Sequence, residues 1–215
     1  MTEEAPTPPV VELRDIHLEF DEKKVLQGVS LVVEPLDRLV IMGQSGSGKS
    51  TILRLILGIL PPTSGSVSFK QFEISRLRHR KLQQIRTQIG MVYQYSALLS
   101  SRSVRDNVAL PLEDPELILF DEPSAGLDPV ISSVIDELII SLTENSQVTS
   151  VIVTHEMDSA FRVGTKMAML YQGKIIEAGD PQQLRQSENP VVAQFLSGST
   201  EGPILEGSQD AIETK

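Results

Sequence analysis

Nine residues near the start of the chain carry glycines, a lysine and hydroxyl side chains at the spacing of a phosphate-binding loop. The run is Gly43-Gln44-Ser45-Gly46-Ser47-Gly48-Lys49-Ser50-Thr51, which fits the pattern G-x-x-x-x-G-K-[ST]. Because glycine lacks Cβ, the backbone N–H groups of such a loop can approach a phosphate, and the following helix points its positive dipole end at the same anion. We expect Lys49 to reach the β- and γ-phosphates of a nucleotide and Ser50 to ligate Mg²⁺. The alternative, a flexible Gly/Ser linker, leaves the apolar segments on both sides unexplained.

A second candidate group lies where an apolar run, residues 117–120, ends in two carboxylates. Such a run predicts a buried strand, and open parallel sheets bind ligands at the carboxyl ends of their strands. Adjacent strand residues point to opposite faces, so the two carboxylates should have different roles. We expect Asp121 to join the Mg²⁺ shell and Glu122 to take a proton from an attacking water. The alternative is a solvated turn before Pro123.

Three further residues have types that suit a nucleotide site but weak signals of their own. Phe20 could stack on adenine, although its spacing alone favours a core aromatic. Gln94 follows a short apolar strand and would be unremarkable by itself. His155 ends the apolar strand 149–154, as Asp121 ends its strand, and could reach a γ-phosphate or a water. The other histidines, His17 and His79, lie in polar-alternating surroundings and are expected at the surface.

The elements expected around these residues alternate between strands and helices. A strand at 38–42 leads into the loop and a helix at 52–57 leaves it. Later strands at 117–121 and 149–154 alternate with helices, and a hairpin turns at Gln172-Gly173. This order predicts an α/β fold with a mostly parallel sheet, preceded by an antiparallel β subdomain formed by a strand at 10–20 and one or two short strands at 25–33.

Residues 75–86 are expected to form an amphipathic helix with a basic exposed face. A solvated surface is the simpler interpretation of that face. Contact with phospholipid headgroups or with a partner protein is the alternative.

Composition narrows the classes of function. The 215 residues suit one domain, and a net charge of −10 argues against a general nucleic-acid binder. The absence of cysteine excludes disulfides and thiolate metal sites. Residues 1–9 are acidic and proline-rich, unlike a secretory signal, and we expect them to be disordered. No apolar run approaches the roughly 20 residues of a membrane span, so a membrane role would require a partner.

In this order, the motifs resemble those of the nucleotide-binding subunits of ABC transporters, which have a P-loop NTPase core. The resemblance implies that residues 43–51 are the Walker A loop, residues 117–121 the Walker B strand and residues 124–128 the D-loop. It also implies ATP and Mg²⁺ as cofactors and ATP hydrolysis coupled to transport. The implied nucleotide contacts are Phe20, Gly43, Gln44, Ser45, Gly46, Ser47, Gly48, Lys49, Ser50 and Thr51. The implied catalytic residues are Glu122, His155, Gln94 and Lys49, and the implied Mg²⁺ ligands are Ser50, Gln94 and Asp121.

A finer resemblance, carried by residues 89–99, 104–112 and 192–204, is to the ATPases of Mla (maintenance of lipid asymmetry) phospholipid transporters. The chain as a whole is expected to hold an ABC-type ATP-binding domain at 10–197 and a C-terminal tail at 198–215. The finer resemblance implies a second ATPase subunit (homodimer or heterodimer), a membrane permease and an MCE-domain lipid carrier as partners. The implied location is peripheral, on the cytoplasmic face of the bacterial inner membrane.

The sequence departs from the ABC pattern in one place. Family members carry a helical subdomain with a Leu-Ser-Gly-Gly-Gln signature between the glutamine and the Walker B strand. Here Gln94 and Asp121 are only 27 positions apart, which indicates an internal deletion of that subdomain near residues 112–114. None of the 14 glycines is adjacent to another, so no Gly-Gly signature exists. The signature helix of one subunit helps to neutralise the γ-phosphate bound to its partner, so we expect ATP binding to persist and turnover to fall. The alternative function is a hydrolysis-deficient ATP-binding remnant or regulatory subunit.

Overall fold

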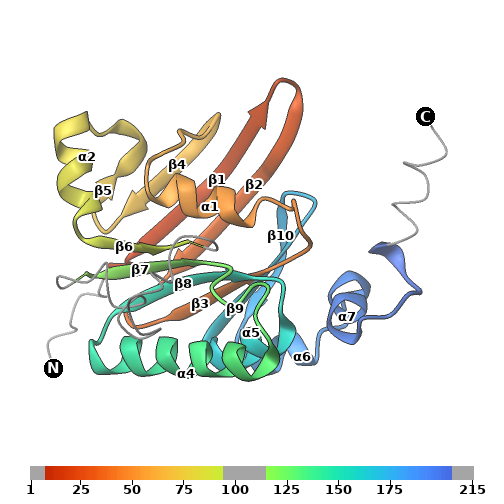
Figure 1. The fold of residues 1–215 in the computed structure, drawn as a ribbon. Helices are drawn as coiled ribbons and strands as arrows, with labels where there is room; N and C mark the ends of the chain where they lie inside the picture. Colours follow the sequence, from red (N-terminus) through yellow and green to blue (C-terminus); the bar gives the residue numbers. More distant parts are fainter. Residues whose placement is uncertain (1–7, 94–114, 205–215) are drawn as a thin grey trace, which may run out of the picture.

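The computed structural model describes residues 8–93 and 115–204, and in this part of the chain two β-sheets lie on either side of a short helix (Figure 1). The larger sheet has six strands in the order β10-β9-β3-β8-β7-β6. Its bounds are β3 (Arg38–Met42), β6 (Ile89–Val92), β7 (Leu117–Asp121), β8 (Thr149–Thr154), β9 (Lys166–Tyr171) and β10 (Lys174–Gly179). All neighbours pair in parallel except β9 and β10, which form the antiparallel hairpin expected from the sequence. The mostly parallel sheet is confirmed.

The smaller sheet is antiparallel and has the order β2-β1-β4-β5. Its strands are β1 (Val11–Phe20), β2 (Lys23–Val33), β4 (Ser64–Phe69) and β5 (Phe72–Glu73). The N-terminal antiparallel subdomain is therefore confirmed, but one continuous strand, β2, replaces the one or two short strands expected at 25–33. Irregular register between β1 and β2 lets the long pair twist without breaking.

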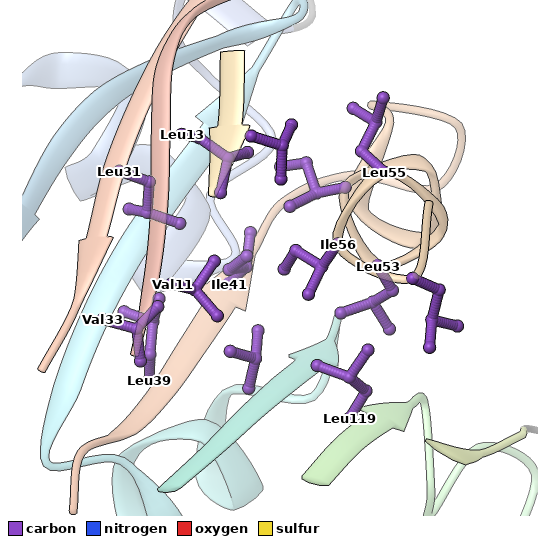
Figure 2. Packing of buried hydrophobic residues seen from close by; sticks show 14 of the residues in the cluster. Val11, Leu13, Leu31, Val33, Leu39, Ile41, Leu53, Leu55, Ile56 and Leu119 are labelled. Atoms are coloured by element: carbon purple, nitrogen blue, oxygen red, sulfur yellow. The ribbon is translucent and has the colours of Figure 1, made fainter. Parts of the chain in front are cut away.

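The central strand β3 is buried on both faces, as expected of a parallel strand in an α/β fold. Leu39 and Ile41 face the smaller sheet and helix α1 (Lys49–Ile56), where they pack with residues such as Leu53 and Ile56 (Figure 2). The alternate residues of the strand, Val40 and Met42, join a second core. That second core is covered by α4 (Pro129–Asn145), α5 (Met157–Val163), α6 (Pro181–Arg185) and α7 (Pro190–Ser197).

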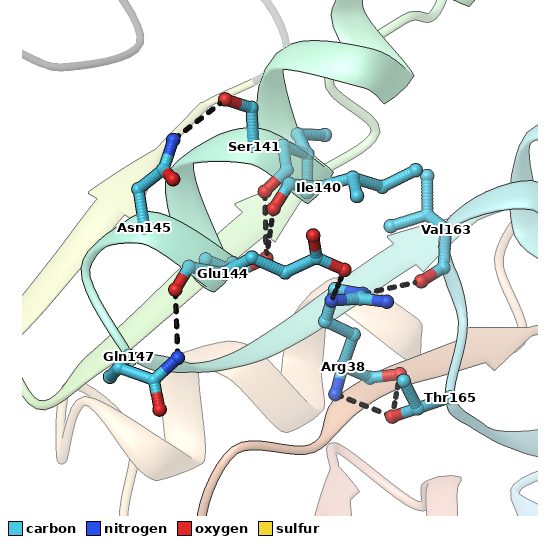
Figure 3. A network of polar contacts seen from close by, with 10 residues as sticks. Arg38, Ile140, Ser141, Glu144, Asn145, Gln147, Val163 and Thr165 are labelled. Carbon is cyan, nitrogen blue, oxygen red and sulfur yellow. Dashed lines mark hydrogen bonds and ion pairs between the residues drawn. The ribbon is translucent and has the colours of Figure 1, made fainter.

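Arg38 anchors the start of β3 to the helical layer on the second face (Figure 3). Its Nε donates to the Val163 carbonyl at 2.8 Å, and its Nη1 pairs with Glu144 Oε1 at 3.0 Å. Its backbone N–H donates to Thr165 Oγ1 at 2.8 Å. Since β3 leads into the phosphate loop, these contacts hold the strand that carries the candidate site.

The expected helix at 75–86 is shorter than predicted. Ile74–Arg76 form a 3₁₀ turn, Arg78 has extended backbone angles, and α2 spans His79–Arg86. Helix starts favour capping side chains and acidic residues, and this basic run supplies neither in the first turn. At the far end, Arg86 donates to the Leu57 and Gly58 carbonyls that follow α1.

The tail expected from residue 198 does not begin as free chain. Ile204 is buried, and its N–H donates to Gln194 Oε1 of α7 at 2.8 Å. Packing on the domain therefore continues to residue 204, seven residues beyond the expected boundary. Within the described ranges, no helix is both long and apolar enough to cross a bilayer.

Candidate nucleotide-binding and hydrolysis site

The phosphate loop is the turn between β3 and α1. A Cβ on Gly43, whose φ is 155°, would lie only 2.2 Å from the Leu170 carbonyl oxygen of β9. Gly48, with φ 107°, starts the helix, and a Cβ there would lie 3.0 Å from Leu26 Cδ2 and 3.4 Å from the Val25 carbonyl oxygen of β2. Both glycines are therefore fixed by backbone conformation and close approach. Sequence reasoning identified the loop but missed Val25 as a neighbour, because that contact crosses between sheets.

Lys49 is buried at the start of α1. Its Nζ donates to the carbonyl oxygens of Gly43 at 2.8 Å and Gln44 at 3.0 Å, and it lies 3.6 Å from Glu122 Oε1. Burial lowers the pKa of the Lys49 ammonium, and the nearby Glu122 carboxylate opposes that shift. The ammonium thus sits inside the loop beside the backbone that would cradle a phosphate.

The two predicted Mg²⁺ ligands in the described residues lie together. Ser50 Oγ donates to Asp121 Oδ1 at 2.7 Å, so the first turn of α1 meets the carboxyl end of β7. Hydroxyl and carboxylate oxygens suit Mg²⁺, which binds through few protein ligands and completes its shell with phosphates and water. Within the described ranges, no cluster of three or more His, Cys, Asp or Glu residues could hold a metal ion.

Ser47 adds an independent sign that the loop accepts a polar ligand. Its Oγ is buried and has no hydrogen-bond partner among the described residues. A buried hydroxyl without a partner is costly, and a phosphate oxygen in the loop could relieve that cost. The cradle thus fits the nucleotide and metal that the sequence predicts.

Glu122 and His155 meet at the carboxyl ends of the neighbouring strands β7 and β8. His155 Nδ1 is 2.9 Å from Glu122 Oε2. Glu122 has a left-handed φ of 47°, which is strained for a residue with a side chain. Its N–H donates to the Val153 carbonyl of β8 at 2.9 Å. The Glu122 carboxylate is mostly buried, whereas the His155 imidazole is about half exposed. The proton acceptor of the pair is therefore shielded from bulk water, and its histidine partner is in contact with solvent.

Phe20, at the end of β1, is 47% exposed. The core position that its spacing favoured is therefore wrong, and adenine stacking stays a prediction. Gln94 lies outside the described residues, as does the junction between Leu112 and Asp114 where the expected deletion falls. His17 and His79 are exposed, as expected.

Polar contacts that sequence reasoning did not identify join the segments that follow β7 and β8. Ser124 Oγ donates to Glu156 Oε2 at 3.1 Å. Asp136 of α4, which is 0% exposed, accepts from Ser159 Oγ at 2.5 Å and from Arg162 Nη1 at 2.7 Å, both on α5. The sequence signal for this contact was an acidic residue at the helical spacing of the buried side of α4, beside Ile135 and Ile139.

Comparison with known proteins identifies the family of this chain. A family model described as ABC transporter matches residues 26–173. The chain is 30% identical to the chloroplastic protein TRIGALACTOSYLDIACYLGLYCEROL 3 of Arabidopsis thaliana, covering 91% of this chain and 75% of that protein. It is 29% identical to the intermembrane phospholipid transport system ATP-binding protein MlaF of Haemophilus influenzae, covering 91% and 93%. These matches extend over 270 and 245 residues, more than the 215 of this chain, so the relatives carry internal residues that it lacks.

The fold comparison agrees. A dimeric ATP-binding cassette, solved in a post-hydrolysis state with ADP and Pi, superposes with a TM-score of 0.68 at 24% identity, covering 80% of this chain and 98% of that chain. The six-stranded sheet, the phosphate loop and the family match together establish that this chain belongs to the ABC transporter family.

Proposed function

We propose that the protein is the ATP-binding subunit of an ABC transporter that moves phospholipid across the bacterial envelope. It would act in a pair, beneath a membrane permease on the cytoplasmic face of the inner membrane, with an MCE-domain lipid carrier further along the route. The likeness to the phospholipid transport ATPase MlaF supports the choice of substrate class. The Ser50–Asp121 contact beside the glycine loop carries the nucleotide-binding part of the proposal.

The proposed roles follow from the positions of the side chains. Lys49 exchanges the Gly43 and Gln44 carbonyls for phosphate oxygens when a nucleotide enters. Glu122 accepts a proton from the attacking water, while His155 orients the carboxylate. Mg²⁺ held by Ser50 and Asp121, together with Gln94, would neutralise phosphate charge. Phe20 stacks on the adenine.

We further propose that the chain binds Mg-ATP but turns it over slowly. The sequence has no Gly-Gly signature, and the relatives have internal residues that this chain lacks. A pair of such chains would lack the group that faces each γ-phosphate from the partner. This same observation favours the second candidate function, a hydrolysis-deficient ATP-binding remnant or regulatory subunit.

Calorimetric titration with Mg-ATP and a phosphate-release assay on the same sample test these proposals. We expect saturable binding, with turnover far below that of intact ABC ATPases. Absence of binding would refute the nucleotide site, whereas turnover at the rate of an intact subunit would refute the proposed loss of hydrolysis. Sequencing the gene between the codons for Leu112 and Asp114 separates the two candidate functions, because an intact frame there that encodes the missing helices would restore a full ATPase subunit.

A further inference from the structure

The start of α2 concentrates exposed positive charge on a chain whose net charge is −10. Four consecutive residues, Arg78, His79, Arg80 and Lys81, are exposed, and we call them the basic patch. Neither Arg78 nor Arg80 forms an ion pair with any residue that the structure describes. The nearby acidic residue Glu73 is already paired with Arg76 at 3.0 Å. The positive charge of the patch is therefore not balanced within the described fold.

The patch also occupies an electrostatically unfavourable position. Arg78 is the N-cap of α2, where no side chain caps the helix and no acidic residue lies in the first turn. Positive charges near a helix N-terminus add to the positive end of the helix dipole. An anion supplied from outside the chain would stabilise both the exposed side chains and the uncapped helix end.

Apolar groups lie next to the basic patch. Lys81 Nζ lies 4.6 Å from the centre of the Phe72 ring. A Cβ on Gly58 would lie within 3.0 Å of Ile74 in the 3₁₀ turn and of Leu82 in α2, and the next residue, Ile59, is 51% exposed. Basic side chains beside exposed apolar ones are typical of surfaces that contact a bilayer. In Figure 1, α2 forms an outer corner of the molecule, away from α4 to α7.

We propose that the basic patch binds anionic phospholipid headgroups, so that the ATPase contacts the membrane surface directly as well as through its permease. Four consecutive residues spread around a helix start instead of lining one side of it, since neighbours in a helix are about 100° apart. The headgroups of a fluid bilayer can rearrange to contact basic side chains that point in several directions. An acidic helix of a partner protein would contact only basic side chains that share one face. The choice of a membrane as the anionic surface rests on the proposed function.

Vesicle flotation tests the proposal with two lipid compositions: phosphatidylcholine alone, and an equal mixture of phosphatidylcholine and phosphatidylglycerol. We expect binding only to the mixture, weakened by added salt. Reversing two charges with R78E/R80E should weaken binding by at least about 30-fold, the factor expected from the loss of two basic residues near an anionic surface alone. The matched control K166E/K174E makes the same charge change at exposed sites on the β9–β10 hairpin and should bind like the parent chain.

Thermal unfolding and Mg-ATP titration of each variant complete the test. R78E/R80E should not lower the Tm, because neither arginine side chain is ion-paired in the described fold and acidic side chains near a helix N-terminus are favourable. Mg-ATP binding should be unchanged, because α2 contacts the end of α1 remote from the phosphate loop. Equal binding to both vesicles, equal loss in both variants, or preference for a polyglutamate peptide over the mixed vesicles would overturn the proposal. Vesicle binding without Mg-ATP binding would instead refute the proposed nucleotide function and leave the basic patch supported.

Discussion

His155 Nδ1 lies 2.9 Å from Glu122 Oε2, while the other oxygen of the same carboxylate lies 3.6 Å from Lys49 Nζ. One carboxylate therefore links the phosphate loop to the ends of β7 and β8. Glu122 is the first residue after β7 and has a left-handed φ of 47°. This strained backbone conformation turns the chain at the end of the strand and accompanies the contacts of the carboxylate with both neighbours. Strain of this kind at a site with ionisable neighbours supports a catalytic role for the residue.

Replacing Glu122 with Gln tests that role. Glutamine keeps the shape of the side chain but cannot accept the proton, so residual phosphate release should fall by about 100-fold or more while Mg-ATP binding remains. Glu137→Gln, at an exposed position of α4, is the matched control and should change neither quantity. Undiminished release by Glu122→Gln would remove Glu122 from the mechanism.

Replacing Lys49 with Ala should abolish nucleotide binding. At a Mg-ATP concentration of about 100 times Kd, the parent chain should gain roughly 2.7 kcal/mol in unfolding free energy, seen as a higher Tm. The variant should show no such gain, because the ammonium inside the loop is gone. Lys166→Ala, at an exposed site on β9, should keep the full gain. A normal Tm shift in the lysine-free loop would contradict the proposed phosphate site.

Two glycines of the same loop should respond differently to alanine. Gly43→Ala places Cβ against the Leu170 carbonyl and should destabilise the fold by about 3 kcal/mol, as expected for a backbone clash. Gly46→Ala meets no atom within 4 Å and should cost only about 1 kcal/mol, from its φ of 76°. Urea unfolding of the two variants provides the measurement, and equal losses would contradict the packing described here.

Stability should depend on pH through Asp136. Burial raises the pKa of this carboxyl, and hydrogen bonds from Ser159 and Arg162 oppose the shift only in part. A raised pKa means that the folded state holds the proton more tightly than the unfolded state, so the stabilising contribution is full below about pH 4 and is lost as pH rises through the folded-state pKa. The unfolding free energy of the parent chain relative to Asp136→Asn should therefore fall as pH rises above about 4. A constant or rising difference would contradict the direction of the shift.

The sequence predicted those parts of the site that depend on local patterns. The loop and the two carboxylates follow from glycine spacing and from an apolar strand ending in acid, and both lie where expected. The exposure of Phe20 was missed because β1 ends beyond the core, which its apolar character alone does not reveal. The Asp136–Arg162 pair and the approach of Val25 to Gly48 depend on contacts between distant segments, which local periodicity does not encode.

A missing helical subdomain should leave apolar surface exposed. Val130 at the start of α4 is 72% exposed. Ile131 and Val134 of the same two turns are also exposed. Poor solubility of the isolated chain stays a prediction, tested by light scattering.

The approach of Gly43 to Leu170 bears on attempts to transplant this phosphate loop into another scaffold. The loop is supported by a carbonyl of β9, a strand more than a hundred residues away in the sequence. A graft of residues 43–51 alone would lose this support and could relax into other conformations. A recipient scaffold would also need a parallel neighbour that matches the β3–β9 register, in which Met42 lies opposite Met169.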